Sequence, residues 1–199
     1  KWNQSDKIDT IRQFMLYKEE YILSLDLNND AGTGLTSQSI TTRHGKYNLF
    51  DFVDECPVLN DLLKFLQKSY LEFVIADNTQ PYYPIEIVCW FNILRKGERI
   101  NIHRHGTNET AYLSGNMHLD TYNSSGTSYS HFDMNHTLPN EKGGLTIFPN
   151  WVAHWVDTWQ EDHPRVSLAF DLYINQSPYF GCAVESKLPF LDEDTLFRL

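Results

Sequence analysis

The chain has 199 residues, and its 16 Lys and Arg residues against 26 Asp and Glu residues give a formal net charge of −10. This acidity argues against nucleic acid as a partner, because affinity for a phosphate backbone comes largely from cationic contacts. Aromatic residues make up 14% of the chain, which is enough for a sizeable core and excludes disorder over most of its length. No apolar run approaches the roughly 20 residues of a membrane span, so we expect no membrane association.

The cysteine content bears on the compartment. Cys56, Cys89 and Cys182 are too few and too scattered for a disulfide framework, and an odd number suits a reducing compartment. No signal-peptide pattern opens the chain, so we expect a cytoplasmic protein. Because the first residue is Lys rather than Met, we also expect a trimmed N-terminus.

Two helical patterns occupy the part of the chain before residue 84. Apolar residues recur at helical intervals over 8–21, and the pattern breaks in the Asn- and Gly-rich stretch 28–34. A second pattern runs over 59–73, with Pro57 near its start and Asp77 near its end. We therefore expect a helical or mixed N-terminal layer over 1–83.

From residue 84 onward the apolar period changes to two, which indicates strands. We expect these strands at 85–94, 99–103, 111–120, 144–148 and 165–174. Clusters of Gly, Asn, Ser and Pro separate them, as is typical of an all-β sandwich or barrel. The sequence thus predicts a mainly β fold with N-terminal helices: one domain over 1–199, with a β core at 84–175 and a tail at 176–199.

Seven of the eight histidines lie between 103 and 163, and three of them form a candidate metal site. In a strand, alternate residues face the same side, so Asn101, His103 and His105 share one face. A barrel can bring His154 back to the same point. Three ligands on one side of an ion leave positions open, which suits non-heme iron, and zinc accepts the same ligands. A His-X-His pair alone more often binds no metal, so the prediction of a metal site depends on how these histidines are spaced relative to other residues of the chain.

That wider spacing resembles the two-part pattern of cupin barrels. The matching residues are Gly97-X5-His103-X-His105-X3-Glu109 and Gly143-X5-Pro149-X4-His154. In cupins both histidines, the acid and the later histidine converge on a metal. The resemblance therefore adds Glu109 as a candidate ligand.

A second candidate site begins eleven residues after His154. Arg165 and Ser167 share one face of the predicted strand with Ala169, Asp171 and Tyr173. A guanidinium binds a carboxylate through two parallel hydrogen bonds, and a neighbouring hydroxyl adds a third, so the pair suits one carboxylate of a small diacid. In isolation the pair is better explained by a surface ion pair and a sheet hydroxyl.

Taken together, these segments resemble the 2-oxoglutarate and Fe(II)-dependent oxygenases, and in particular a group of small bacterial and phage members. The matching segments are Trp90-Phe91-Asn92, Lys96-Gly97, His103-Arg104-His105, Leu113-Ser114-Gly115, Gly143-Gly144-Leu145, Phe148-Pro149, His154, and Arg165-Val166-Ser167 with Phe170. The resemblance implies a double-stranded β-helix, a jelly-roll or cupin-like barrel, with Fe(II) as cofactor and 2-oxoglutarate as cosubstrate. By the same resemblance His103 and His154 are metal ligands, and Arg165 with Ser167 holds the C5 carboxylate of 2-oxoglutarate.

The third ligand is left open at this point, because many of these oxygenases carry His-X-Asp or His-X-Glu where this chain has His-X-His. The alternatives are His105, Glu109 and a water molecule. The literal His-X-Asp at His118 and Asp120 ranks lower, since its matching family positions are not ligands. Asn92 is a further candidate for the cosubstrate.

Further residues are predicted to line the pocket or to stay outside it. The pocket candidates share one face of the strand at 111–120 and are Tyr112, Ser114, Asn116 and His118. The histidines predicted to be solvated or locally hydrogen-bonded are His44, His131, His136 and His163.

The function predicted by the resemblance is hydroxylation of a C–H bond in a small molecule or peptide, with consumption of O2 and release of succinate and CO2. Two alternatives remain at this point. One is a cupin-type metal dioxygenase or isomerase that does not use 2-oxoglutarate, and the other is a non-catalytic binding barrel. The oligomeric state is open, with a homodimer among the options.

Overall fold

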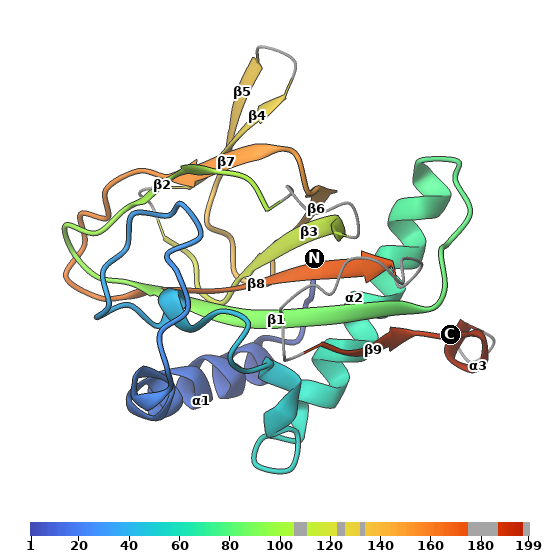
Figure 1. Cartoon of the computed structure of the whole chain (residues 1–199), viewed down its shortest axis with the longest axis horizontal. Coiled ribbons are helices and arrows are strands. Elements are labelled where there is room, and N and C mark those ends of the chain that lie inside the picture. Colours follow the sequence, from blue (N-terminus) through green and yellow to red (C-terminus); the bar gives the residue numbers. More distant parts are fainter. Residues whose placement is uncertain (106–110, 123–125, 132–133, 175–186, 197–199) are drawn as a thin grey trace.

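The structure is a computed structural model that describes residues 1–105, 111–122, 126–131, 134–174 and 187–196. Four helical elements precede the first strand (Figure 1), and they are α1 (Ser5–Ser24), the 3-10 turns η1 (Ile40–Arg43) and η2 (Leu49–Phe52), and α2 (Val58–Ala76). A short helix, α3 (Glu193–Leu196), follows the last strand. Both predicted helices are present, and α2 begins after Pro57 and ends before Asp77, as the sequence indicates.

The described residues include nine strands, which form two sheets that face each other. Their bounds are β1 (Ile85–Leu94), β2 (Ile100–His103), β3 (Ala111–His118), β4 (Thr127–His131), β5 (Met134–Leu138), β6 (Leu145–Pro149), β7 (Ala153–Val156), β8 (Arg165–Ile174) and β9 (Leu188–Leu191). The five-stranded sheet has the order β6-β3-β8-β1-β9, and the four-stranded sheet has the order β2-β7-β4-β5. The chain thus folds as a mainly β jelly roll, a double-stranded β-helix, which confirms the predicted fold class.

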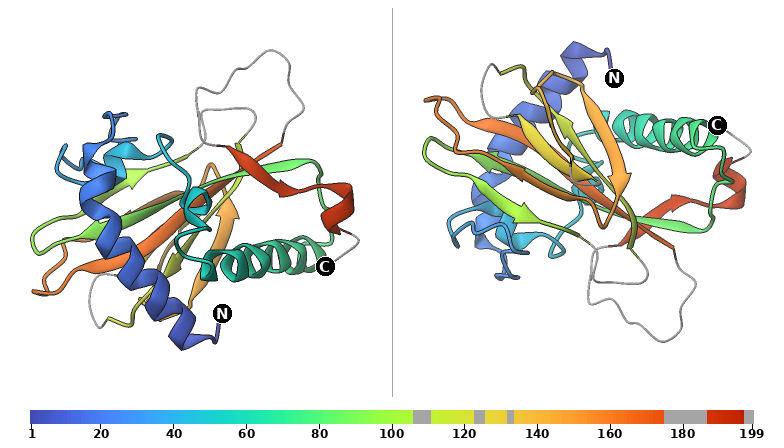
Figure 2. Two further views of the ribbon diagram at one scale, coloured as in Figure 1. Left: turned by 90° about the horizontal axis from the view of Figure 1, so that it is seen from below. Right: turned by 90° about the horizontal axis from the view of Figure 1, so that it is seen from above.

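The helices cover the outer face of the five-stranded sheet and leave its inner face to the four-stranded sheet (Figures 1 and 2). Helix α1 turns Ile8, Ile11, Met15 and Ile22 toward the sheet, and none of them is more than 1% exposed. Their spacing of three, four and seven residues places them on one face of the helix. This layer fixes the five-stranded sheet from behind, so that its inner side chains can form a site.

The strands at the centre of the large sheet are the ones that the sequence predicts best. Strands β1 and β8 pair over ten residues each, and almost every residue in both is buried. Strands β4, β5, β7 and β9 are missed by the sequence analysis. All five residues of β5 are exposed and β7 has only four residues, so neither carries a readable apolar period.

Strand β3 departs from regular alternation at Tyr112. Ala111 pairs with Tyr173 and Leu113 with Leu172, so two steps on β3 oppose one step on β8. This is a β-bulge, and it shifts Tyr112 off the face that Ser114 and the following alternate residues share. Separately, none of the described helices is long and apolar enough to cross a membrane.

Candidate metal centre and anion pocket

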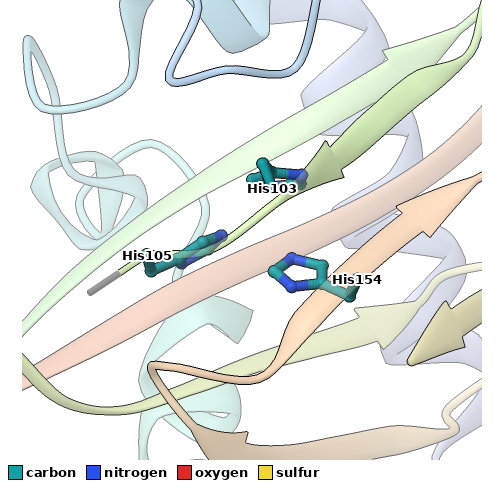
Figure 3. A group of neighbouring side chains, drawn as sticks. All are labelled: His103, His105 and His154. Atoms are coloured by element: carbon teal, nitrogen blue, oxygen red, sulfur yellow. The ribbon is translucent and has the colours of Figure 1, made fainter. Parts of the chain in front are cut away.

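Three histidine side chains meet between the two sheets (Figure 3). His103 at the end of β2 pairs in register with His154 on β7, which places their rings 4.2 Å apart between centroids. His105 follows β2, and its ring centroid lies 5.3 Å from that of His103 and 4.9 Å from that of His154. One nitrogen from each ring lies within 4.8 Å of the other two, close enough for one ion to draw them together.

The second ring nitrogen of each histidine is held by a group that only accepts hydrogen bonds. Nδ1 of His103 lies 2.9 Å from the carbonyl oxygen of Asn101, and Nδ1 of His154 lies 3.1 Å from that of Val152. Nδ1 of His105 lies 2.6 Å from Oδ1 of Asp171. Since these oxygens cannot donate, each Nδ1 carries the hydrogen, and in the neutral ring the lone pair is on Nε2. The three rings are thus prepared to bind a metal through Nε2.

Burial keeps two of these rings neutral. Desolvation is the main cause that lowers the pKa of His103 to about 4, and the nearby His105 lowers it further. Desolvation lowers the pKa of His154 to about 2, again with contributions from His105 and His103. Both rings are therefore unprotonated near pH 7, which is the state that a metal requires.

The guanidinium of Arg165, at the start of β8, is 2% exposed and has only neutral partners among the described residues. It donates to Oδ1 of Asn140 at 3.0 Å, to Oγ of Ser167 at 3.2 Å and to Oγ1 of Thr127 at 2.9 Å. It also lies 3.5 Å from Nδ1 of His118. Burial lowers the pKa of Arg165 to about 10, so the group is still a cation near neutral pH. A buried cation without a counter-anion favours binding of an anion.

One pocket joins the triad to this cation. It encloses about 590 Å³, part of it open to solvent, and its lining includes His103, His105, His154, Arg165 and Ser167. The metal-binding nitrogens and the guanidinium therefore face the same space. A ligand with two acidic ends can reach both.

Two amides also line this pocket. Oδ1 of Asn92 on β1 accepts a hydrogen bond of 2.7 Å from Thr41. Nδ2 of Asn116 on β3 donates to the hydroxyl of Tyr129 at 2.6 Å, while its buried Oδ1 has no partner among the described residues. An unpaired buried acceptor is unfavourable in a folded protein, so Oδ1 of Asn116 is a position where a bound molecule can donate a hydrogen bond.

The other residues predicted on β3 lie outside the pocket lining. Tyr112, displaced by the bulge, packs against Tyr70 of α2 and Tyr82, with ring centroids 6.3 and 5.1 Å away. Ser114 donates to Asp171 behind the triad, and His118 stands behind Arg165. Glu109 lies outside the described residues.

Two residues that the sequence analysis did not assign are part of the site. His44 is predicted to be solvated or locally hydrogen-bonded, and its Nδ1 lies 3.1 Å from the carbonyl oxygen of Thr41. It also lines the pocket, with its ring 6.0 Å from Trp90, whose ring lies 5.6 Å from that of His105. Burial lowers the pKa of His44. Asp171 holds His105, and its only sequence signal is that it shares the face of Arg165 and Ser167.

The segment between α1 and η1 forms one wall of the pocket. Ala31 and Thr33 line it, and the carbonyl oxygen of Thr33 accepts a hydrogen bond from the backbone of Asn101, beside the triad. Gly34 has a φ of +73°, and a Cβ atom there would lie 2.1 Å from Nδ2 of Asn101. The turn therefore requires glycine at this position, both for its backbone and for its close approach to β2.

The fold and the site together define a jelly-roll protein with a candidate three-histidine metal centre and an adjoining anion pocket. Nitrogen ligands with open positions fit Fe(II), although the usual iron triad of this kind has two histidines and one carboxylate. The chemistry of the donor set therefore fits a non-heme iron protein.

Comparison with known proteins agrees with this class. Residues 88–171 match the model of a family described as "Putative 2OG-Fe(II) oxygenase". A prolyl-4-hydroxylase from Pseudomonas putida has a similar structure over 86% of this chain and 88% of its own, with a TM-score of 0.60 at 12% identity. A prolyl hydroxylase from Trichoplax adhaerens, solved with a hypoxia inducible factor peptide fragment, is similar over 85% of this chain and 79% of its own, with a TM-score of 0.54 at 10% identity.

A third similar structure is an oxidoreductase of the 2OG-Fe(II) oxygenase family from Burkholderia pseudomallei, with a TM-score of 0.43 at 16% identity. The match covers 47% of this chain and spans only about half of that protein, 48% of its length. No curated protein matches the sequence. The predicted resemblance is confirmed, because residues 88–171 match this family model and the fold is similar to those of the two prolyl hydroxylases. The family implies Fe(II) and 2-oxoglutarate as cofactor and cosubstrate.

Proposed function

We propose that the protein hydroxylates a C–H bond of a small molecule or peptide, using Fe(II), O2 and 2-oxoglutarate and releasing succinate and CO2. The observation that supports this most directly is that the histidine triad and the unpaired cation of Arg165 open into one pocket. A cupin-type enzyme without 2-oxoglutarate needs no buried guanidinium there. A binding barrel needs neither feature.

Within this proposal the three histidines hold Fe(II) through Nε2, with His103 and His154 as two of the ligands and His105 as the third. Bound Fe(II) supplies the reaction with O2 that couples oxidative decarboxylation of 2-oxoglutarate to oxidation of the substrate. The hydrogen bonds at each Nδ1 fix the rings so that the metal geometry is set before the substrate enters.

Arg165 and Ser167 bind the carboxylate of 2-oxoglutarate that lies farthest from the metal. The guanidinium offers a planar pair of donors, and Thr127 and Asn140 hold it in place. Asn92 lines the same pocket, and because its Oδ1 accepts from Thr41, its Nδ2 can donate to the cosubstrate. Oδ1 of Asn116 can instead accept a hydrogen bond from a donor on the substrate. The buried setting strengthens these contacts and keeps water away from the reacting groups.

The test is anaerobic reconstitution of the full chain with Fe(II), followed by 2-oxoglutarate. We expect a weak visible charge-transfer band, and we expect it to be absent in Arg165→Ala. Iron affinity should collapse in His103→Ala and His154→Ala. Retained affinity in His105→Ala would assign the third position to Glu109 or water. Iron binding with no band, and no effect of Arg165→Ala, would refute the use of 2-oxoglutarate.

A further inference from the structure

We propose that Asp171 is a positioning residue that supplies, through His105, the negative charge that this three-histidine triad lacks. The inference rests on the proposed function, since it concerns how the same site holds Fe(II). A triad of two histidines and a carboxylate places one anionic ligand on the metal, whereas three neutral imidazoles place none.

The contact between Asp171 and His105 is short and buried. Oδ1 of the carboxylate lies 2.6 Å from Nδ1 of His105, and the Asp171 side chain is 7% exposed. Because the carboxylate accepts the hydrogen from Nδ1, electron density is pushed toward Nε2, and the imidazole becomes a stronger donor to a cation. His103 and His154 differ in this respect, as their Nδ1 atoms face backbone carbonyls.

The sheet holds this carboxylate in position. Asp171 pairs in register with Ser114 across β3 and β8, and the hydroxyl of Ser114 donates to the same Oδ1 at 2.7 Å. Ser114 is fully buried, so its hydroxyl has little freedom to turn away. Ser114 on β3 thus holds the carboxylate of Asp171, which is on β8, in contact with His105.

A buried carboxylate is unfavourable unless positive charge lies close to it. The described contacts of Asp171 are one hydroxyl and one imidazole, and neither carries a permanent charge. A divalent ion bound behind His105 would provide that charge. A bound divalent cation gives this buried carboxylate a physical reason, and the carboxylate in turn increases the affinity for the cation.

The test is metal affinity, measured on apo full-length protein by competition between the triad and a chelator, with Fe(II) under anaerobic conditions and with Co(II). Asp171→Asn keeps the shape and an acceptor for Nδ1 but removes the charge. We expect its dissociation constant to rise about 10- to 100-fold, which is the usual effect of losing such a partner. Asp61→Asn is the matched control, because it removes the charge of an exposed carboxylate that pairs with Lys7 outside the pocket lining, and we expect a change below about threefold.

A second measurement separates charge from folding. The Fe(III)/Fe(II) midpoint potential should be higher in Asp171→Asn than in wild type, because less negative charge is left to stabilise Fe(III), whereas Asp61→Asn should leave it unchanged. An unaltered affinity and potential in Asp171→Asn would overturn the inference. If Asp171→Asn has no effect while His103→Ala and His154→Ala abolish metal binding in the same experiment, only the role of Asp171 fails and the metal site of the proposed function stands. If wild type itself binds no metal, both fail.

Discussion

Replacing Arg165 by Met is expected to separate cosubstrate binding from stability. The guanidinium is fully desolvated, and its described partners are neutral. Met has a similar length but no charge, so the variant loses hydrogen bonds and also the unfavourable burial of a cation. These effects oppose each other, and we expect the unligated protein to change in stability by less than about 2 kcal/mol.

Binding of 2-oxoglutarate should respond very differently. Two hydrogen bonds from a charged donor are worth about 3 to 6 kcal/mol together, so their loss weakens binding by at least about 100-fold. At 100 times its dissociation constant a ligand stabilises the wild type by about 2.7 kcal/mol, which is about 5 to 11 °C for a chain of this length. At the same concentration Arg165→Met should gain only about 0.4 kcal/mol.

The assay is thermal unfolding of the Fe(II) protein under anaerobic conditions, with and without 2-oxoglutarate. Arg95→Met is the matched control, since Arg95 forms an exposed ion pair with Glu19. That variant should lose at most about 1 kcal/mol and keep the full ligand-induced shift. A full shift in Arg165→Met would refute the assignment of the anion pocket.

Three further predictions concern neighbouring residues. Asn92→Ala should raise the KM for 2-oxoglutarate about fivefold or more in a decarboxylation assay, because the variant loses the amide donor of a pocket side chain whose Oδ1 already accepts from Thr41, whereas Tyr112→Phe should not. Gly115→Ala should lower stability by about 1 to 3 kcal/mol in denaturant unfolding, because a Cβ atom there lies 2.3 Å from Cζ of Phe170. Burial lowers the pKa of His118 to about 3, so the unfolded state binds a proton below about pH 6.5 while the native state does not. The stability that His118 contributes is complete above that pH and is lost on acidification toward pH 3. Between pH 7 and pH 5 the wild type should therefore lose up to about 2 kcal/mol more than His118→Asn.

Each of these has a clear contrary result. Equal KM values for Asn92→Ala and wild type would remove Asn92 from the cosubstrate site. An undiminished stability of Gly115→Ala would show that β3 and β8 can separate at this point. Parallel pH profiles for wild type and His118→Asn would mean that His118 is not held neutral in the native state.

The long strands and helices are predicted well from the sequence, because each has a buried face whose apolar residues recur at a regular period. The bounds of strands β1 and β8 are predicted to within a residue, and Pro57 and Asp77 flank α2 both in the sequence prediction and in the structure. Strand β5 has no buried face, so the apolar pattern that predicts a strand is missing there although the hydrogen bonds are present. The pairing of β5 with β4 depends on both segments, so neither segment's sequence predicts it alone.

The same division holds within the site. Strand alternation predicted that His103 and His105 point to one side and that Arg165 and Ser167 share a face, and the motif resemblance added His154. The displacement of Tyr112 depends on a bulge, which arises from the register between β3 and β8. The alternation of apolar and polar residues within β3 does not predict its register with β8.

What the sequence by itself determined is therefore a set of candidate residues and a resemblance: three histidines that could bind a metal, an arginine and a serine on one strand face, and the class of enzyme that they indicate. What only the tertiary structure decided is which neutral or charged groups surround them. Arg165 is buried with no counter-anion among the described residues, His44 lies beside Trp90, and Nδ1 of His105 donates to Asp171. Each of these arrangements brings together segments that lie far apart in the chain. Burial and contact are set by all the packed elements at once, and for that reason they become visible only in the folded protein.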